Sequence, residues 1–367
     1  MRFKKWEQFC DLIKYLKSDR HSGIYSGFVG ENNLGDEILW QSIKEVFLPL
    51  NLVNVPKSAN QLINQLMQSQ LKFHKFVILG GGTLIGANLP NGHNPFRDKF
   101  AEVQKRVKFS FVFGTGVGKL SLVDDENNWL KEWQPILSNC QYVGVRGPHS
   151  LNSLTSINIK AEILGDPACL MTQKLGFWQP DQKKLGINVG YSLGGKKRPA
   201  EQIRFIQLIT EFVKEQSNKG WTIEFFVVAP QDIQVTEQVI RDAQLSNYKV
   251  NCIFEDAIPY LMMVRKMNIF IGMKLHSSIL AMCAGIPTIM IEYAPKCLDF
   301  MTSVDMADFN INIQDVTREK LNQLMINLLS YSESISNKVN SKMLQLKKKQ
   351  TGKSQELQVL LSDNGSI

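Results

Sequence analysis

The chain has 367 residues, of which 44% are hydrophobic and 21% are charged. This composition is that of a folded globular protein, and the length is sufficient for two domains of ordinary size. The net charge of +8 suits nucleic acid, anionic lipid or an anionic small substrate. Because the basic residues are dispersed, except towards residue 350, nucleic acid is not expected as a partner. The six cysteines form no CxxC pair, which argues against a zinc site or a disulfide framework and favours a reducing compartment.

Residues 1–22 begin with a basic stretch and then place Trp6, Phe9, Ile13 and Leu16 near helical spacing. No uninterrupted apolar core follows the basic stretch, so this is not a secretory signal. We expect an amphipathic helix that docks on the protein body, with contact to a membrane surface as the alternative. No segment of the sequence reads as a membrane span, so a cytoplasmic protein is expected, with peripheral contact at the inner membrane face left open.

Between residues 23 and 170, short apolar runs alternate with helical stretches, as in a parallel sheet with helices on both faces. The predicted strands are 23–29, 75–79, 110–113, 142–145 and 162–164. Three of them run into the glycine-rich turns GENNLG, GGGTLIG and GTGVGK. Ligands of open α/β sheets bind beyond the carboxyl ends of the strands, where such turns cluster. This region is predicted to form a Rossmann-like domain with a ligand site at its glycine-rich edge.

The first of these turns, GENNLGDE, ends in Asp36 and Glu37, where a phosphate-binding loop would have Lys and Ser or Thr. Capping of a helix N-terminus and complementarity to its dipole explain these acids without any function. The functional interpretation is that an acid on this loop binds sugar hydroxyls or removes a hydroxyl proton. Asp36 or Glu37 would then be catalytic, and Gly30, Asn33 and Gly35 would belong to a loop that faces a hydroxylated acceptor.

The two other turns are less informative. GGGTLIG could supply backbone N–H groups to a ligand or only permit tight packing, which makes Gly81, Gly82 and Thr83 candidate binding residues. GTGVGK has Lys119 where a GxGxxG motif has its third glycine, and no acidic ribose ligand follows at the usual distance. A nicotinamide-dependent dehydrogenase is therefore not expected.

A second α/β set follows a stretch without periodicity, residues 171–184, which is predicted to be an interdomain linker. The second domain, 185–310, has predicted strands at 185–192, 222–230, 248–254, 268–273 and 287–293, and a helix at 201–219. Two doubly wound domains that face each other predict a ligand-binding cleft between them. Residues 311–367 are predicted to form a helical, basic C-terminal segment, in which Lys347–Lys349 form a solvated helix face or contact anionic lipid.

Basic side chains lie just past the predicted strands of both halves. The guanidinium fork of Arg146 suits a carboxylate or phosphate, although an exposed surface arginine is the simpler explanation. Lys274 and His276 lie between a strand and a helix, where the helix dipole favours an anion, and alternation along an extended segment would point both to one side. A cation and an imidazole are costly to bury without a ligand, so a functional role is favoured over a structural histidine. Lys296 could add charge to the same edge.

In their order along the chain, GENNLGDE, VILGGGTLIG, VRGPHS, LGDPA and KLHSSILAMCAGIPTIMIEYAPK resemble the motifs of the polysaccharide pyruvyltransferase family. The resemblance spans about residues 23–300. It implies two Rossmann-like domains similar to the GT-B glycosyltransferases. It also implies transfer of a pyruvyl or enolpyruvyl group from phosphoenolpyruvate, as co-substrate, to sugar hydroxyls of cell-surface glycans, usually as a cyclic ketal. No metal or other cofactor is required by that reaction.

The resemblance implies donor-binding and catalytic roles for Arg146, Lys274 and His276, with Lys296 as a further candidate donor-binding residue. His276 would be the general acid, and Asp36 or Glu37 would accept the hydroxyl proton. The first domain would then bind the sugar or lipid-linked glycan acceptor, and the second the donor.

One departure from the family pattern concerns the donor. The family usually has Arg-Leu-His where this chain has Lys274-Leu275-His276, and lysine lacks the bidentate fork of arginine. Two alternatives therefore stay open. One is a GT-B glycosyltransferase with a nucleotide-sugar donor, and the other is a non-catalytic glycan-binding relative.

Overall fold

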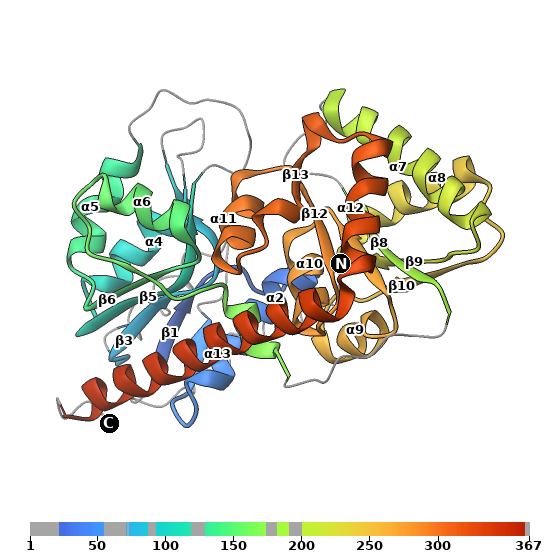
Figure 1. Cartoon of the computed structure of the whole chain (residues 1–367). Helices are drawn as coiled ribbons and strands as arrows, with labels where there is room; N and C mark the ends of the chain where they lie inside the picture. Colours follow the sequence, from blue (N-terminus) through green and yellow to red (C-terminus); the bar gives the residue numbers. More distant parts are fainter. Residues whose placement is uncertain are drawn as a thin grey trace, which may run out of the picture.

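The computed structural model describes residues 22–54, 71, 73–86, 93–118, 129–173, 182–190 and 200–363. Two parallel sheets flanked by helices lie side by side, and the last long helix runs beneath both of them (Figure 1). The predicted α/β class with two doubly wound sheets is confirmed. The amphipathic helix predicted for residues 1–22, Ser22 apart, and positions 174–181 of the predicted linker lie outside the described residues.

The first sheet contains seven described strands in the order β2-β1-β3-β5-β6-β7, with β4 paired to β5. The strands are β1 (Gly23–Ser26), β2 (Leu52–Asn54), β3 (Phe76–Leu79), β4 (Gly82–Ile85), β5 (Phe109–Val117), β6 (Tyr142–Val145) and β7 (Glu162–Ile163). The accompanying helices are α2 (Leu34–Val46), α4 (Pro95–Gln104), α5 (Trp129–Ser138) and α6 (Pro148–Thr155). β1 and β3 are buried along their whole length, which is why their sequences are apolar runs without alternation.

The second sheet has the order β10-β9-β8-β11-β12-β13 among the described strands. These are β8 (Lys184–Asn188), β9 (Thr222–Val227), β10 (Tyr248–Cys252), β11 (Ile269–Gly272), β12 (Thr288–Glu292) and β13 (Asn310–Asn312). The helices are α7 (Ala200–Asn218), α8 (Ile233–Ala243), α9 (Ala257–Val264), α10 (Leu275–Cys283), α11 (Pro295–Ser303), α12 (Arg318–Ser330) and α13 (Ser332–Asp363). All pairings in both sheets are parallel, as βαβ crossovers require.

The strand order reverses at one point in each sheet. In the first sheet the reversal lies between β1 and β3, and in the second it lies between β8 and β11. At such a switch point the loops that follow two neighbouring strands diverge to opposite faces and leave a crevice for a ligand. The GENNLG loop follows β1, and Lys274 follows β11. The acidic loop of the first half and Lys274 and His276 of the second half therefore lie at switch points, whereas Arg146 follows β6 and Lys296 follows β12.

Helix α2 connects the two halves, although it follows the first strand of the first sheet. Leu34, Ile38 and Leu39 are buried in the same hydrophobic cluster as the strands and helices of the second sheet. The Leu34 N–H also donates to the carbonyl oxygen of Val228 at 3.0 Å. Helix α2 of the first half is thus packed into the hydrophobic core of the second half.

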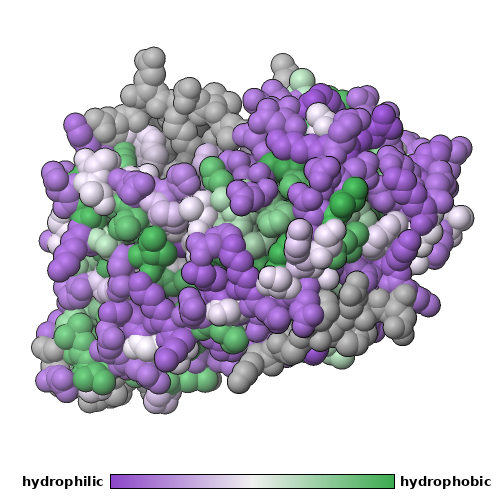
Figure 2. All heavy atoms as spheres, viewed as in Figure 1, coloured by the Kyte–Doolittle hydropathy of each residue, from purple (hydrophilic) through white to green (hydrophobic). Residues whose placement is uncertain are grey.

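The helical C-terminal segment is packed against both halves. Near its start, α13 is held by the hydrogen bond from Ser336 Oγ to the carbonyl oxygen of Gly285 (2.5 Å). Near its end, Leu357 and Leu361 are buried in the hydrophobic cluster of the first sheet. The face along which α13 runs is mainly hydrophilic, with small hydrophobic patches (Figure 2).

The lysine run within α13 is partly engaged with the protein. Lys347 Nζ donates to the carbonyl oxygen of Thr172 at 2.7 Å, and Lys349 Nζ lies 2.9 Å from Glu162 Oε2. Among the residues that the structure describes, no helix is sufficiently long and apolar to cross a bilayer. Peripheral contact with a membrane stays a prediction.

Candidate active site

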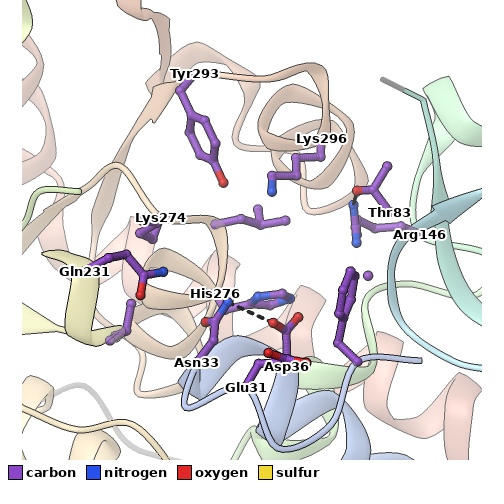
Figure 3. A pocket seen from close by; sticks show the side chains of 14 residues that line it. Glu31, Asn33, Asp36, Thr83, Arg146, Gln231, Lys274, His276, Tyr293 and Lys296 are labelled. Atoms are coloured by element: carbon purple, nitrogen blue, oxygen red, sulfur yellow. Dashed lines mark hydrogen bonds between the residues drawn. The ribbon is translucent and has the colours of Figure 1, made fainter. Parts of the chain in front are cut away.

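A cavity of about 400 Å³ lies between the two halves, where the loops of both switch points meet. This volume is within the usual range for small-molecule sites. Figure 3 shows polar side chains that converge on it from both sides. The first half contributes Glu31, Asn33, Asp36, Thr83 and Arg146, and the second half contributes Gln231, Lys274, His276, Tyr293 and Lys296. The cavity brings together all the predicted basic residues and one of the two predicted acids.

Arg146 reaches the cavity from the end of β6 and is only 1% exposed. Its Nε donates to Asp166 Oδ2 at 2.8 Å, and its Nη1 donates to Thr83 Oγ1 at 3.3 Å. Gly116 leaves room for this guanidinium, because a Cβ there would lie 2.5 Å from Nη1. Nη2 is buried without a hydrogen-bond partner among the described residues. Arg146 also lines the cavity, and a guanidinium there is suited to an anionic ligand.

Asp166 lies behind Arg146 and is inaccessible to solvent. Burial disfavours its charged form, but Arg146 and His276 outweigh that effect and lower the pKa of the carboxyl to about 2. Asp166 Oδ1 also accepts the N–H of Ala168 at 3.0 Å, which caps the short 3₁₀ helix Pro167–Met171. The carboxylate is therefore a fixed negative charge behind Arg146 and His276, which line the cavity.

His276 lies in the first turn of α10, and its Nε2 is 3.7 Å from Asp166 Oδ2. α10 begins at Leu275, so the extended alternation predicted for this segment is wrong. Lys274 and His276 nevertheless both line the cavity, because the first is the N-cap and the second belongs to the first helical turn. Gly35 packs directly on the imidazole, since a Cβ at that position would be 2.1 Å from His276 Nδ1.

Lys274 is fixed by two residues of the second half. Its backbone N–H donates to Asn188 Oδ1 at 2.8 Å, and its Nζ lies 3.4 Å from the buried Asp232 Oδ1. Gly190 gives this pair its space, because a Cβ there would be 2.5 Å from Lys274 Cε. The ammonium group is thus supported by a carboxylate at its back, as Arg146 is by Asp166.

Lys296 lies in the first turn of α11, and its Nζ is 4.9 Å from the ring centre of Tyr293. Burial lowers the pKa of Lys296, and the nearby Arg146 guanidinium lowers it further. An anion in the cavity would favour its protonated form. No side chain caps α10 or α11, so the N-termini of both helices are available to a negatively charged ligand.

The loop after β1 separates the two predicted acids. Asp36 lines the cavity, and its Oδ2 accepts a hydrogen bond from Asn33 Nδ2 at 2.8 Å. Burial raises the pKa of Asp36, although His276 and Lys296 oppose the shift. Glu37 does not line the cavity: its Oε1 accepts the N–H groups of Gly30 (2.7 Å) and Glu31 (3.1 Å).

The glycines of these loops have different tasks. Gly30 has a φ of 73°, which closes the turn whose N–H groups bind Glu37. Gly82, with a φ of 96°, lines the cavity beside Thr83. Gly81 is outside the lining, and it permits packing, because a Cβ there would be 2.7 Å from Leu39 Cδ2. Only part of GGGTLIG therefore faces a ligand.

A model of the polysaccharide pyruvyl transferase family matches residues 33–295, which is most of the chain. The chain belongs to this family. No curated protein matches it significantly. The matched range contains every candidate residue named above except Gly30, Glu31 and Lys296.

Solved structures with a similar fold include two UDP-GlcNAc 2-epimerases and an O-GlcNAc transferase. The UDP-GlcNAc 2-epimerase of Neisseria meningitidis bound to UDP-GlcNAc has a TM-score of 0.53 and 10% identity over 87% of this chain and 94% of that chain. The UDP-GlcNAc 2-epimerase of Methanocaldococcus jannaschii has a TM-score of 0.52 and 12% identity over 84% and 92%. A mutant O-GlcNAc transferase of Thermobaculum terrenum has a TM-score of 0.50 and 9% identity over 93% and 67%. At these identities the likeness shows the fold alone, which is GT-B-like as predicted.

Five polar residues that lie in or next to the cavity were not identified from the sequence. Asp166 is in the LGDPA motif but was not assigned a role, and Asp232 follows β9 in the segment APQD. Glu31, Gln231 and Tyr293 also line the cavity. Their position just after strands was the available signal. Among the described residues, no three His, Cys, Asp or Glu side chains are grouped as metal ligands would be.

Proposed function

We propose that this protein transfers a pyruvyl group from phosphoenolpyruvate to hydroxyls of a sugar acceptor and forms a cyclic ketal. The observation that carries the proposal is the convergence of Arg146, Lys274 and Lys296 on one cavity together with His276. Phosphoenolpyruvate has a phosphate and a carboxylate on neighbouring atoms, so it needs several cations within a few ångströms. Family membership supports the same donor.

The two ends of the donor fit the two halves of the cavity. Lys274 and Lys296 lie at the N-termini of α10 and α11, where a dianionic phosphate is stabilised by the charges and by the helix dipoles. Arg146 lines the cavity from the first half, and we place the donor carboxylate beside its guanidinium. The central carbon of the donor would then lie between the two halves, close to His276 and Asp36.

The proposed chemistry begins with a proton from His276 to the methylene carbon of the donor, which leaves positive character on the central carbon. A sugar hydroxyl attacks that carbon, and Asp36 accepts its proton. The bond between the central carbon and the phosphate oxygen then breaks, inorganic phosphate leaves, and a second hydroxyl of the sugar closes the ketal. The raised pKa of Asp36 suits a group that must accept a proton.

Phosphoenolpyruvate is a metabolite of the cytoplasm, so the proposed reaction takes place there. We propose that the acceptor is a saccharide of a cell-surface glycan or its lipid-linked precursor, bound on the side of Glu31, Asn33 and Asp36. Carboxylate and amide groups on this loop are suitable partners for neutral hydroxyls. No cofactor is invoked, and that expectation remains a prediction.

Thermal unfolding with phosphoenolpyruvate, UDP, GDP and CMP in parallel tests the donor. A ligand at 100 times its Kd adds about 2.7 kcal/mol to the free energy of unfolding, which is a readable shift. We expect phosphoenolpyruvate alone to stabilise the wild type, and Lys274→Gln to lose the shift. Lys249→Gln, an exposed lysine on β10, is the matched control and should keep it. A shift with a nucleotide instead would favour a glycosyltransferase and overturn the proposal.

Turnover is then measured as phosphate release with a panel of p-nitrophenyl glycosides as acceptors. Loss of a general base lowers kcat by about 100-fold or more, so we expect this for Asp36→Asn. Glu37→Gln keeps an acceptor for the Gly30 and Glu31 N–H groups and should retain most activity. If Glu37→Gln lost turnover and Asp36→Asn kept it, Glu37 would be the general base. Binding of donor and glycosides without phosphate release would indicate a non-catalytic relative.

A further inference from the structure

The imidazole of His276 has two different nitrogens in this site. Nε2 is buried without a hydrogen-bond partner among the described residues and lies 3.7 Å from Asp166 Oδ2. The side chain as a whole is 16% exposed and lines the cavity, so its accessible part lies away from Nε2. Of the two ring nitrogens, Nδ1 is therefore the one left for a substrate in the cavity.

Gly35 provides a second, independent observation about the same ring. It lies in the first turn of α2, with its Cα against the imidazole, and a Cβ there would be 2.1 Å from Nδ1 and 2.7 Å from Cγ. Gly35 has no positive φ, so its backbone does not require glycine. What requires glycine is the close packing of α2 on the Nδ1 side of the ring.

We propose that Asp166 is the positioning residue that accepts Nε2–H of His276, so that Nδ1 is the atom that delivers the proton. The catalytic meaning of this assignment rests on the proposed function. In the reaction, the electron pair of the donor's carbon–carbon double bond takes the Nδ1 proton, a C–H bond forms, and the N–H bond breaks. The ring is left neutral with its remaining hydrogen on Nε2, facing Asp166. A carboxylate behind an imidazole fixes both its tautomer and its orientation.

The charges around His276 come from five elements of the fold. They are Asp166 before the 3₁₀ helix, Asp36 on α2, Arg146 after β6, Lys274 at the start of α10 and Lys296 on α11. Three of these are cations and two are acids. Of the two acids, Asp36 has its pKa raised by burial, whereas the pKa of Asp166 is lowered to about 2. Asp166 is therefore the acid that remains an anion beside the ring throughout the working pH range.

Nitrogen NMR of the full chain with [15N]histidine tests the assignment without any substrate. The chain has five histidines, so His276 is assigned by comparison with His276→Gln. We expect the neutral ring to carry its hydrogen on Nε2. In Asp166→Asn, an opposite charge within 4 Å is lost, so the midpoint of the His276 titration should move to lower pH by about one unit or more. The signals of His74 and His149 should not move. A neutral ring with hydrogen on Nδ1, or an unchanged midpoint, would overturn the proposal.

Gly35→Ala is the second variant, because Asp166→Asn leaves a buried Arg146 without its carboxylate and can unfold. Alanine keeps the helix, but its Cβ would overlap the Nδ1 side of the ring and displace it, so phosphate release should fall by about 100-fold or more, the usual contribution of a general acid. Gly352→Ala on α13, where a Cβ has open space, is the control and should be fully active. An active Gly35→Ala would contradict the role of Nδ1. If the NMR result holds and phosphoenolpyruvate neither binds nor reacts, the proposed function fails and the positioning by Asp166 stands.

Discussion

Asp299 caps a helix in the opposite half of the molecule. It lies on α11 and is 3% exposed. Its carboxylate accepts the N–H of His149 at 2.9 Å, the N–H of Ser150 at 3.3 Å and the Ser150 hydroxyl at 2.5 Å. These are N–H groups of the first turn of α6, whose N-cap, Gly147, has no side chain to offer. α6 begins two residues after Arg146, so the cap also positions the cavity wall.

The cost of removing this cap follows from its three bonds. Loss of an N-cap side chain costs about 1 kcal/mol, and a hydrogen bond to a charged group contributes about 1.5–3 kcal/mol. Part of this is offset because the carboxylate is hydrated in the unfolded chain. We therefore expect Asp299→Ala to lower the free energy of unfolding by about 3 kcal/mol. Asp299→Asn keeps an acceptor for the two N–H groups and should cost only about 1 kcal/mol.

Urea unfolding gives the global effect, and hydrogen exchange of the peptide that contains α6 gives the local one. Amide exchange in the first turn of α6 should accelerate most in Asp299→Ala. Asp308→Ala, an exposed acid close in sequence, is the control and should stay within about 0.5 kcal/mol of wild type. If Asp299→Ala and the control have the same free energy of unfolding, or if the amides of α6 exchange as in wild type, Asp299 does not stabilise the contact between α11 and α6.

Three further changes follow from burial and charge. Asp36→Asn should raise the thermal stability at neutral pH while it lowers turnover. Burial raises the pKa of Asp36, so its charge destabilises the folded state. Differential scanning calorimetry at pH 7.5 measures the melting temperature, and an unchanged or lower value would contradict this reasoning. The pKa of Asp166 is lowered from 3.8 to about 2, so the unfolded state takes up the proton first as the pH falls. Above pH 4 the charged carboxylate therefore contributes on the order of 2 kcal/mol to the free energy of unfolding. This contribution is lost as the pH falls towards 2. Urea unfolding between pH 5 and pH 2.5 should therefore show a shallower loss of stability in Asp166→Asn than in wild type. Leu361→Ala should cost about 2–4 kcal/mol, whereas Val359→Ala, 58% exposed, should cost less than about 0.5 kcal/mol; equal urea midpoints would argue against docking of α13.

The sequence predicted most of the described strands, because most of them are apolar runs, and it also indicated the two-residue β7 and the mostly exposed β10. It did not predict β2, β4 or β13, which have three or four residues each. β4 (Gly82–Ile85) lies inside the GGGTLIG run and pairs with β5, so its glycines indicated a turn where the backbone is extended. Local pattern cannot show such a pairing, since the partner lies about thirty residues away.

The site was predictable where chemistry and strand ends coincide, and not where it depends on tertiary contacts. Arg146 could be placed at the carboxyl edge of the first sheet, and Lys274 and His276 at that of the second, because ligands of such sheets bind beyond the strand ends. The turn of Glu37 back to the loop amides has no signature beyond its spacing. Asp166 looked like a local turn residue, and only the folded chain brings it against two side chains of different halves.

The packing of α13 has a consequence for synthesis of the chain. Leu357 and Leu361 belong to the same cluster as Tyr25 and Phe76, so the core of the first sheet is completed by residues translated nearly three hundred positions later. Until that helix emerges from the ribosome, the nascent first sheet exposes the apolar surface that the helix will cover. Chains released early are therefore expected to be substrates for chaperones and proteases, even when every residue of the cavity has already been made.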